Sequence, residues 1–112
     1  MVTILKDIIG KCSGLNIDEK RSIADDYVEI VFLNKEIGAW RKVLTDTLGP
    51  EIKPAGVEPT ESELDLTKDF GGIRGNQTLF KKAFDDVIVI AILWPWQDGV
   101  RTTLKIALFK NG

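Results

Sequence analysis

The alternation of apolar and polar residues is strongest in the last quarter of the chain, where it predicts a β-hairpin. β-branched and aromatic residues dominate 87–96 and 100–110, and Asp98-Gly99 lies between the two runs. Asp-Gly between apolar strands is typical of a two-residue type I′ turn, which needs positive φ at both central residues. A turn of this length fixes the register of the strands, so we expect Leu93 to face Leu104.

The two faces of the predicted hairpin differ in character. In this register one face is wholly apolar and carries Val89, Ala91, Leu93, Leu104, Ile106 and Leu108. The other face is mixed and carries Ile88, Ile90, Ile92, Trp94, Trp96, Arg101, Thr103, Lys105, Ala107 and Phe109. Because the second face is more apolar than water favours, we expect it to be covered, either by the rest of the chain or by another molecule.

A helical period of apolar residues opens the chain. Side chains that return every three to four residues predict a helix from about Thr3 to Cys12. Asn16 and Glu19 then stand three residues apart, which is the spacing of a capping box. We therefore expect a second helix to begin near Ile17.

The second predicted helix runs towards Leu48 but cannot be continuous. Without a break from Asp18 to Leu48 it would be about 46 Å long, whereas a domain of this size has a radius of gyration of about 13 Å. We therefore expect a break near Asn34-Lys35. Residues 27–33 are rich in β-branched and aromatic side chains, so a buried strand there is the alternative to a helix.

Residues 49–76 change in character and read as a long loop. The segment is rich in glycine, proline and carboxylates. Thr60 and Glu63 have the spacing of a capping box, which predicts a short helical turn over 61–68. A connection of this length inside a small domain is unusual, and such loops are often functional.

The segment before the hairpin is ambiguous. Apolar residues in 78–85 have helical spacing, with Thr78 as a cap, so we favour a short helix; a strand that leads into a turn at Asp85-Asp86 is the alternative. The predicted fold class is α+β, with N-terminal helices packed on a C-terminal antiparallel hairpin or a small three-stranded antiparallel sheet. We expect a single domain over 1–112, with helices in 1–48, a long loop in 49–76, a short helix or strand in 78–85 and the hairpin in 87–110.

Composition narrows the classes of function. The chain has 112 residues, a formal net charge of −2 and 44% hydrophobic residues, which is enough for one core. Weak acidity gives no general attraction to nucleic acid, and the apolar run 87–94 is shorter than the roughly 20 residues of a membrane helix. The only cysteine, Cys12, excludes an intramolecular disulfide, and the first residues lack a signal-peptide pattern. We expect a cytoplasmic protein that binds neither nucleic acid nor membrane.

The chain lacks the residues of the common catalytic and metal sites. It has no histidine, which is the commonest general base and metal ligand, and one cysteine cannot form a multi-thiolate site. No phosphate-binding or dinucleotide-binding glycine motif is present. We therefore predict no catalytic residue, no metal and no cofactor. A histidine-independent enzyme using Asp69, Arg74 and Asp85 or Asp86 is the least favoured alternative, because these groups would have to converge in a cleft.

The stretch 69–77 is the most site-like motif. Its glycines allow backbone N–H groups to approach an anion, and Arg74 offers a fork-shaped charge. The positive end of a helix beginning near Thr78 would add to such a site. The other interpretation is a flexible loop with a solvated Arg74. The predicted ligand-binding residues are Gly71, Gly72, Arg74, Gly75 and Gln77.

Trp94-Pro95-Trp96, near the hairpin tip, is the second candidate site. The tryptophans either form a partner-binding patch, with Arg101 on the same face, or cover the core beneath a helix. Because the hairpin is apolar on both faces, our leading prediction is a non-enzymatic protein-interaction module that associates with itself as a homodimer. A small-molecule or anion-binding protein using 69–77 with Arg74 is the alternative.

Overall fold

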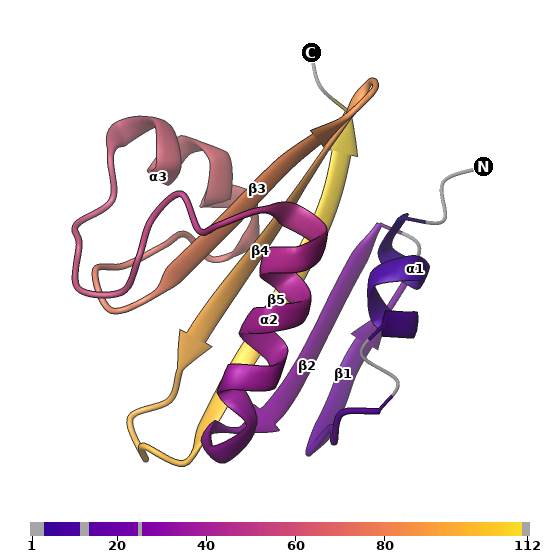
Figure 1. Ribbon diagram of the computed structural model, residues 1–112. Coiled ribbons are helices and arrows are strands. Elements are labelled where there is room, and N and C mark those ends of the chain that lie inside the picture. The colour runs from indigo at the N-terminus through magenta and orange to yellow at the C-terminus, as the bar shows by residue number, and fades with distance from the viewer. Residues whose placement is uncertain (1–3, 12–13, 25, 111–112) are drawn as a thin grey trace.

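A five-stranded antiparallel sheet organises the chain (Figure 1). The computed structural model describes residues 4–11, 14–24 and 26–110. The strands lie in the order β1-β2-β5-β4-β3. Their bounds are β1 (Glu19–Ile23), β2 (Tyr27–Leu33), β3 (Thr78–Phe84), β4 (Val87–Pro95) and β5 (Arg101–Lys110). The strand nearest the C-terminus therefore occupies the middle of the sheet.

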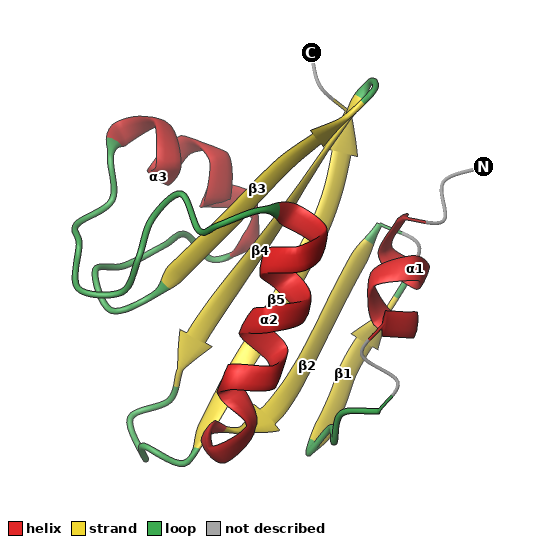
Figure 2. Ribbon diagram, viewed as in Figure 1, coloured by secondary structure: helices red, strands yellow, loops and turns green. Residues whose placement is uncertain are grey.

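The helices divide between the two faces of the sheet. Within the described residues they are α1 (Ile4–Lys11), α2 (Ile37–Leu48) and α3 (Glu61–Thr67), with 3₁₀ turns at Asn34–Glu36 and Lys68–Phe70. Figure 2 shows α1 and α2 together on the face of the sheet turned towards the viewer. Side chains from α3 and the loop after it pack on the opposite face.

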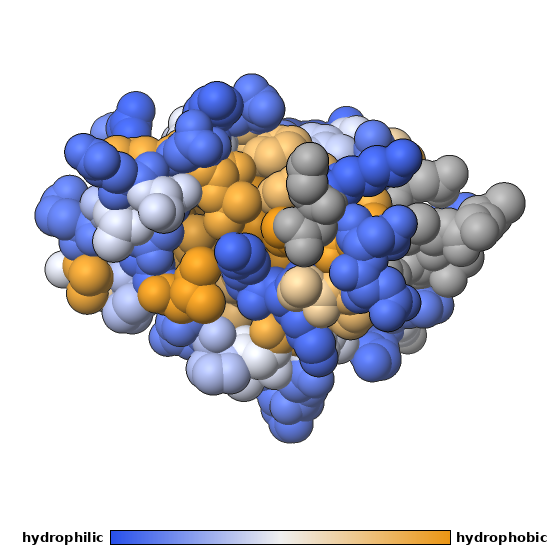
Figure 3. Space-filling model, turned by 90° about the horizontal axis from the view of Figure 1, so that it is seen from above, coloured by the Kyte–Doolittle hydropathy of each residue, from blue (hydrophilic) through white to orange (hydrophobic). Residues whose placement is uncertain are grey.

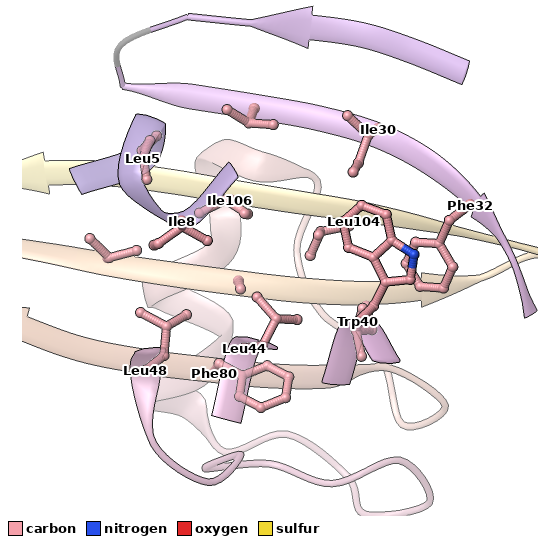
Figure 4. Close-up of a cluster of buried hydrophobic side chains, with 14 residues drawn as sticks. Leu5, Ile8, Ile30, Phe32, Trp40, Leu44, Leu48, Phe80, Leu104 and Ile106 are labelled. Atoms are coloured by element: carbon pink, nitrogen blue, oxygen red, sulfur yellow. The ribbon is translucent and has the colours of Figure 1, made fainter. Parts of the chain in front are cut away.

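The first core lies between the sheet and the helices α1 and α2. Figure 4 shows its side chains converging from α1, α2 and four of the strands. The rings of Phe32 and Trp40 stack with their centroids 5.0 Å apart. The fully buried members include Leu5, Ile30, Phe32, Trp40, Leu44, Phe80, Val89, Leu104 and Ile106.

A second, smaller core lies on the other face. Phe70, from the 3₁₀ turn after α3, stacks on Tyr27 of β2 and Phe109 of β5, with ring centroids 6.0 and 6.1 Å away. The buried members of this core are Ile73, Leu79, Ile90, Ile92 and Ala107. The long connection 49–77 is therefore a cover for the second face of the sheet, and α3 is part of that cover.

The N-terminal half departs most from the sequence prediction. The helix predicted from Thr3 is confirmed as α1, although Cys12 lies outside the described residues. The helix predicted from Ile17 is wrong as far as the expected break, because Glu19 begins β1 instead of closing a capping box. Beyond the break it is confirmed as α2. Asn16 donates from Nδ2 to Glu36 Oε1 at 3.0 Å.

The alternative for 27–33 is the correct one. This segment is β2, an inner strand that pairs with β1 and β5. Ile30, Val31 and Phe32 are all fully buried, because both faces of the strand are covered. The predicted break near Asn34-Lys35 coincides with the 3₁₀ turn that precedes α2.

The prediction for 61–68 is confirmed by α3. Thr60 Oγ1 accepts from the Glu63 backbone N–H at 3.2 Å, and Glu63 Oε1 accepts from the Thr60 backbone N–H at 2.9 Å. The helix favoured for 78–85 is wrong, because the segment is the edge strand β3. The alternative turn is present, and Asp85 within it has φ of 53°.

The register of the C-terminal hairpin is confirmed, but its turn type is wrong. Leu93 faces Leu104 as predicted. Of the two turn residues only Gly99 has positive φ, at 70°, so the turn is not type I′. Asp98 Oδ1 instead accepts from the backbone N–H groups of Val100 and Arg101, at 2.8 and 3.1 Å. The α+β class is correct, and the sheet is larger than the two or three strands expected.

Candidate binding surface

The cover on the second face of the sheet is incomplete. Beyond Phe70 it leaves a hollow of about 540 Å³ at the end of the sheet near the β4–β5 turn. We call its lining the tryptophan surface: Arg21, Glu29, Trp94, Pro95, Trp96, Gln97, Asp98, Thr103 and Lys105. These residues come from β1, β2, β4, β5 and the turn, so the surface exists only when the sheet is assembled.

Trp94 and Lys105 form the inner wall of the hollow, and both are half-buried. Lys105 Nζ lies 4.0 Å from the centroid of the Trp94 ring and donates to the Phe70 carbonyl at 3.1 Å. Gly71 makes this approach feasible. It has φ of 93°, and a Cβ there would lie 3.0 Å from Lys105 Nζ and 3.1 Å from a Trp94 ring carbon.

Trp96 forms the outer wall between two arginines. The guanidinium carbons of Arg21 and Arg101 lie 5.3 and 5.8 Å from its ring centroid, within the range of cation–π attraction. Its Nε1 donates to Thr103 Oγ1 at 2.7 Å. The indole is therefore held in one orientation, with its polar edge satisfied and its faces against charge.

The two arginines are themselves paired with carboxylates. Arg101 contacts Asp18 and Asp98, each at 3.1 Å. Arg21 bonds to Glu19 and lies 3.5 Å from Glu29.

Glu29 is also engaged on its own strand. It accepts from the Tyr27 hydroxyl at 2.6 Å. Burial and then this hydrogen bond raise the pKa of Tyr27. Tyr27 therefore stays neutral and keeps donating over the physiological range of pH.

Lys105 is the exception among these charges. It faces Glu29 across the β2–β5 pair, yet within the described residues no carboxylate lies within 4.0 Å of its ammonium. Burial lowers its pKa; Glu29 opposes this shift and Arg21 adds to it. The hollow therefore contains a half-buried cation held by a carbonyl and a ring without a carboxylate partner.

Several backbone N–H groups of the predicted ligand-binding stretch 69–77 are used in hydrogen bonds inside the protein. The Gly72 backbone N–H donates to Thr67 O at 2.9 Å, and the Arg74 backbone N–H donates to Gln77 Oε1 at 2.9 Å. The Gln77 backbone N–H donates to Arg74 O at 3.1 Å. These amides bond within the loop, and no helix follows at Thr78 to add a positive end. The Arg74 side chain is exposed.

Lys53 organises this loop and was not singled out by its sequence context. It is 1% exposed, and its Nζ donates to the carbonyls of Pro54, Gly75 and Gln77 at 3.0, 3.1 and 2.6 Å. These bonds use all three ammonium hydrogens. Burial lowers the pKa of Lys53, and Glu63 and Glu58 partly oppose the shift. Through these bonds Lys53 joins the segment after α2 to the loop before β3, and both belong to the cover of the second face.

The carboxylate enzyme considered above finds little geometric support. Arg74 precedes β3 and Asp85 follows it, so they stand at opposite ends of a seven-residue strand, about 20 Å apart. Within the described part of the chain, no three acidic or cysteine side chains are grouped so that they could hold a metal ion.

Other exposed apolar residues occur, so apolar area alone does not select a site. Figure 3 shows hydrophobic residues across the middle of one end of the molecule, with hydrophilic residues around them. A second hollow, of about 610 Å³, lies between α1 and β1 and is lined mostly by apolar side chains. The tryptophan surface differs because it joins two indoles to a lysine that no carboxylate of the described residues contacts within 4.0 Å.

No helix in the described ranges is long and apolar enough to cross a membrane. Comparisons with protein-family models, with curated proteins and with solved structures give no match for this chain.

Proposed function

We propose that this protein is a non-catalytic binding module that docks a segment of a partner protein on the tryptophan surface. One observation carries the proposal: the chain covers only part of the second face of its sheet and leaves two indoles around a hollow of about 540 Å³. Tryptophan and arginine are the residues that most often dominate binding energy at protein interfaces. The rigid mounting of Trp96 reduces the entropy that would be lost on binding.

Both edges of the sheet are protected against the addition of another strand, which favours docking of a partner on the second face instead. β1 is short, its side chains are mostly charged and a bulge interrupts its pairing between Lys20 and Ser22. The outer edge of β3 is partly occupied, because the Leu79 N–H donates to Lys53 O at 3.0 Å. Bulges, charge and cover are the devices that prevent an added strand. A partner is therefore expected to lie on the hollow.

Peptide selection tests this proposal. A random peptide library would be selected on the wild type and on Trp96→Ala, with Val57→Ser as the control variant that removes an apolar residue half exposed elsewhere. Thermal melts would confirm that all three proteins are folded. We expect peptides that bind the wild type and Val57→Ser equally and bind Trp96→Ala at least about tenfold more weakly.

Two outcomes would count against the proposal. Either no peptide is enriched on the wild type over Trp96→Ala, or the enriched peptides bind both proteins alike. Sedimentation at micromolar concentration addresses the other occupant, a second copy of this chain. A dimer that Trp96→Ala converts to a monomer would replace the partner segment with a homodimer.

A cytoplasmic location is a further part of the proposal. It is supported by the near-neutral charge and the single cysteine, which give no sign of a disulfide-stabilised secreted protein. Fractionation of cells that express the tagged chain would test it, and recovery from the membrane or the medium would contradict it.

A further inference from the structure

The charges of the tryptophan surface are unevenly balanced. Arg21 and Arg101 each have two carboxylates nearby, so four carboxylates serve two guanidinium groups. Lys105 has none within 4.0 Å among the described residues. A half-buried ammonium without a counter-ion is costly, because burial disfavours the charged form unless a partner compensates for it.

Glu29 would be the natural partner of Lys105, and it is directed elsewhere. The two residues are paired across β2 and β5, where opposite charges usually meet. Glu29 is instead bonded to the Tyr27 hydroxyl and lies near Arg21. Lys105 lies against Trp94 and the Phe70 carbonyl. The ammonium is thus held at the hollow with hydrogens to spare, because one of its three is used by the described residues.

Thr103 supplies a second donor in the same hollow. Its Oγ1 accepts from Trp96 Nε1, and within the described residues its own hydrogen has no acceptor. Thr103 and Lys105 lie two residues apart on β5 and therefore point from the same face of the sheet. Both line the hollow. Two donors that line the same hollow suit an acceptor with two oxygens, such as a carboxylate.

We propose that the tryptophan surface recognises an acidic side chain, Asp or Glu, next to an apolar residue in the docked segment; this rests on the proposed function. The carboxylate accepts from Lys105 Nζ and Thr103 Oγ1 and supplies the missing counter-ion. The apolar neighbour lies in the hollow beside Trp94. A doubly charged phosphate is disfavoured relative to a singly charged carboxylate. The four carboxylates Glu19, Glu29, Asp18 and Asp98 already outnumber the three cations Arg21, Arg101 and Lys105 by one, so each further negative charge adds repulsion.

Small probes separate charge recognition from docking. Phenylacetate carries a carboxylate next to an apolar ring, phenylacetamide is its uncharged counterpart and phenyl phosphate is the doubly charged arm. Each would be titrated into ¹⁵N-labelled protein while the amide shifts of β5 are followed. We expect phenylacetate to bind at least about tenfold more tightly than either other probe, as loss of a charged hydrogen bond implies.

Three variants assign the preference to Lys105. Lys105→Met should remove the tenfold preference and Lys105→Arg should keep most of it, because Arg retains the charge. Lys82→Met is the matched control: Lys82 Nζ also lies over an aromatic ring, 5.2 Å from the centroid of Phe84, but on β3 and away from the hollow. It should leave all three affinities unchanged.

The outcomes distinguish this inference from the proposed function. Equal binding of phenylacetate and phenylacetamide would overturn carboxylate recognition and leave the docking surface in place. Preference for phenyl phosphate would replace the acidic side chain with a phosphorylated one. If neither phenylacetate nor phenylacetamide shifts the backbone amide signals of β5 while selected peptides bind, carboxylate recognition is contradicted and the proposed function is not. If no selected peptide depends on Trp96, the proposed function fails as well.

Discussion

The two faces of the sheet are built on different principles. On the first face, helices α1 and α2 bring a continuous apolar layer against the sheet, and its central side chains are fully buried. On the second face, the cover is mainly irregular chain with one short helix, closed by a buried lysine and bordered by charges. Apolar packing dominates the first face, whereas the second face combines a smaller apolar core with particular hydrogen bonds. The contrast places the larger apolar core on one face and the proposed docking surface on the other.

Truncation in the first core should have the largest effect. Leu44 is fully buried on α2, so Leu44→Ala should lower the free energy of unfolding by about 3 kcal/mol through lost burial and a cavity. Leu64→Ala on α3 is the control and should cost less than about 1 kcal/mol, because Leu64 is largely exposed. Urea unfolding gives both values. Similar losses in the two variants would contradict the division between the faces.

Removal of the buried cation should be nearly as severe on the second face. Lys53→Met keeps the side-chain length but leaves the carbonyls of Pro54 and Gln77 without their donor, whereas Gly75 O keeps the Gly56 N–H at 2.7 Å. We expect a loss of about 2–4 kcal/mol, since buried unsatisfied groups each cost about 1–3 kcal/mol. Lys68→Met, on an exposed lysine near α3, should change stability by less than about 0.5 kcal/mol. A loss of stability for Lys53→Met as small as that of Lys68→Met would show that the bonds from Lys53 to the carbonyls do not stabilise the cover of the second face.

The same lysine predicts a dependence on pH. Burial lowers the pKa of Lys53 below 10.5, so the unfolded chain holds this proton to higher pH than the folded chain. Between those two pKa values the unfolded state binds more protons, and the stability that depends on Lys53 therefore rises with pH. The gap in free energy of unfolding between wild type and Lys53→Met should therefore widen as the pH is raised towards 10.5.

Subtraction of the variant isolates Lys53 in this experiment. Tyr27 acts in the opposite sense, because its raised pKa lowers stability as the unfolded tyrosine ionises. Tyr27 and Lys105 are present in both proteins, so their contributions cancel in the difference. A gap that stays constant or narrows would mean that the pKa of Lys53 is not lowered by folding.

Two glycines provide the smallest and most local comparison. Gly71→Ala on the second face should cost about 1–2 kcal/mol, because φ is 93° and a Cβ would press on Lys105 and Trp94. Gly38→Ala on α2 should instead stabilise by about 0.5–1 kcal/mol, since its Cβ would meet nothing within 4 Å. Thermal melts of both variants would show the opposite signs, and equal signs would remove the reason given for Gly71.

The sequence predicted correctly those elements whose residue pattern fits one kind of secondary structure and no other. The hairpin register followed from the position and length of the turn at Asp98-Gly99, and Thr60 and Glu63 revealed α3 because a capping box is local. β2 was harder, because a strand covered on both faces has no alternation and its Ile30 and Leu33 happened to extend a helical stripe. In β3, buried residues followed by exposed lysines imitated helical spacing, since an edge strand is half-covered along its length.

Of the candidate site, the sequence predicted only residues that belong to the C-terminal hairpin. Trp94, Trp96 and Arg101 were placed together because strand register brings them together. Arg21 and Glu29 were missed because their segments were assigned to a helix. The role of Lys53 had no local signal, since its three partners lie up to 24 residues away along the chain.

The position of β5 has a consequence for synthesis on the ribosome. β1 and β2 form one hairpin and β3 and β4 form another, and within the sheet the two are joined only through β5. Neither hairpin can complete its inner edge until the last of the five strands has left the exit tunnel. Until then both hairpins expose strand edges that can pair with other nascent chains and aggregate. A chaperone that binds extended apolar segments should protect these edges until β5 is available.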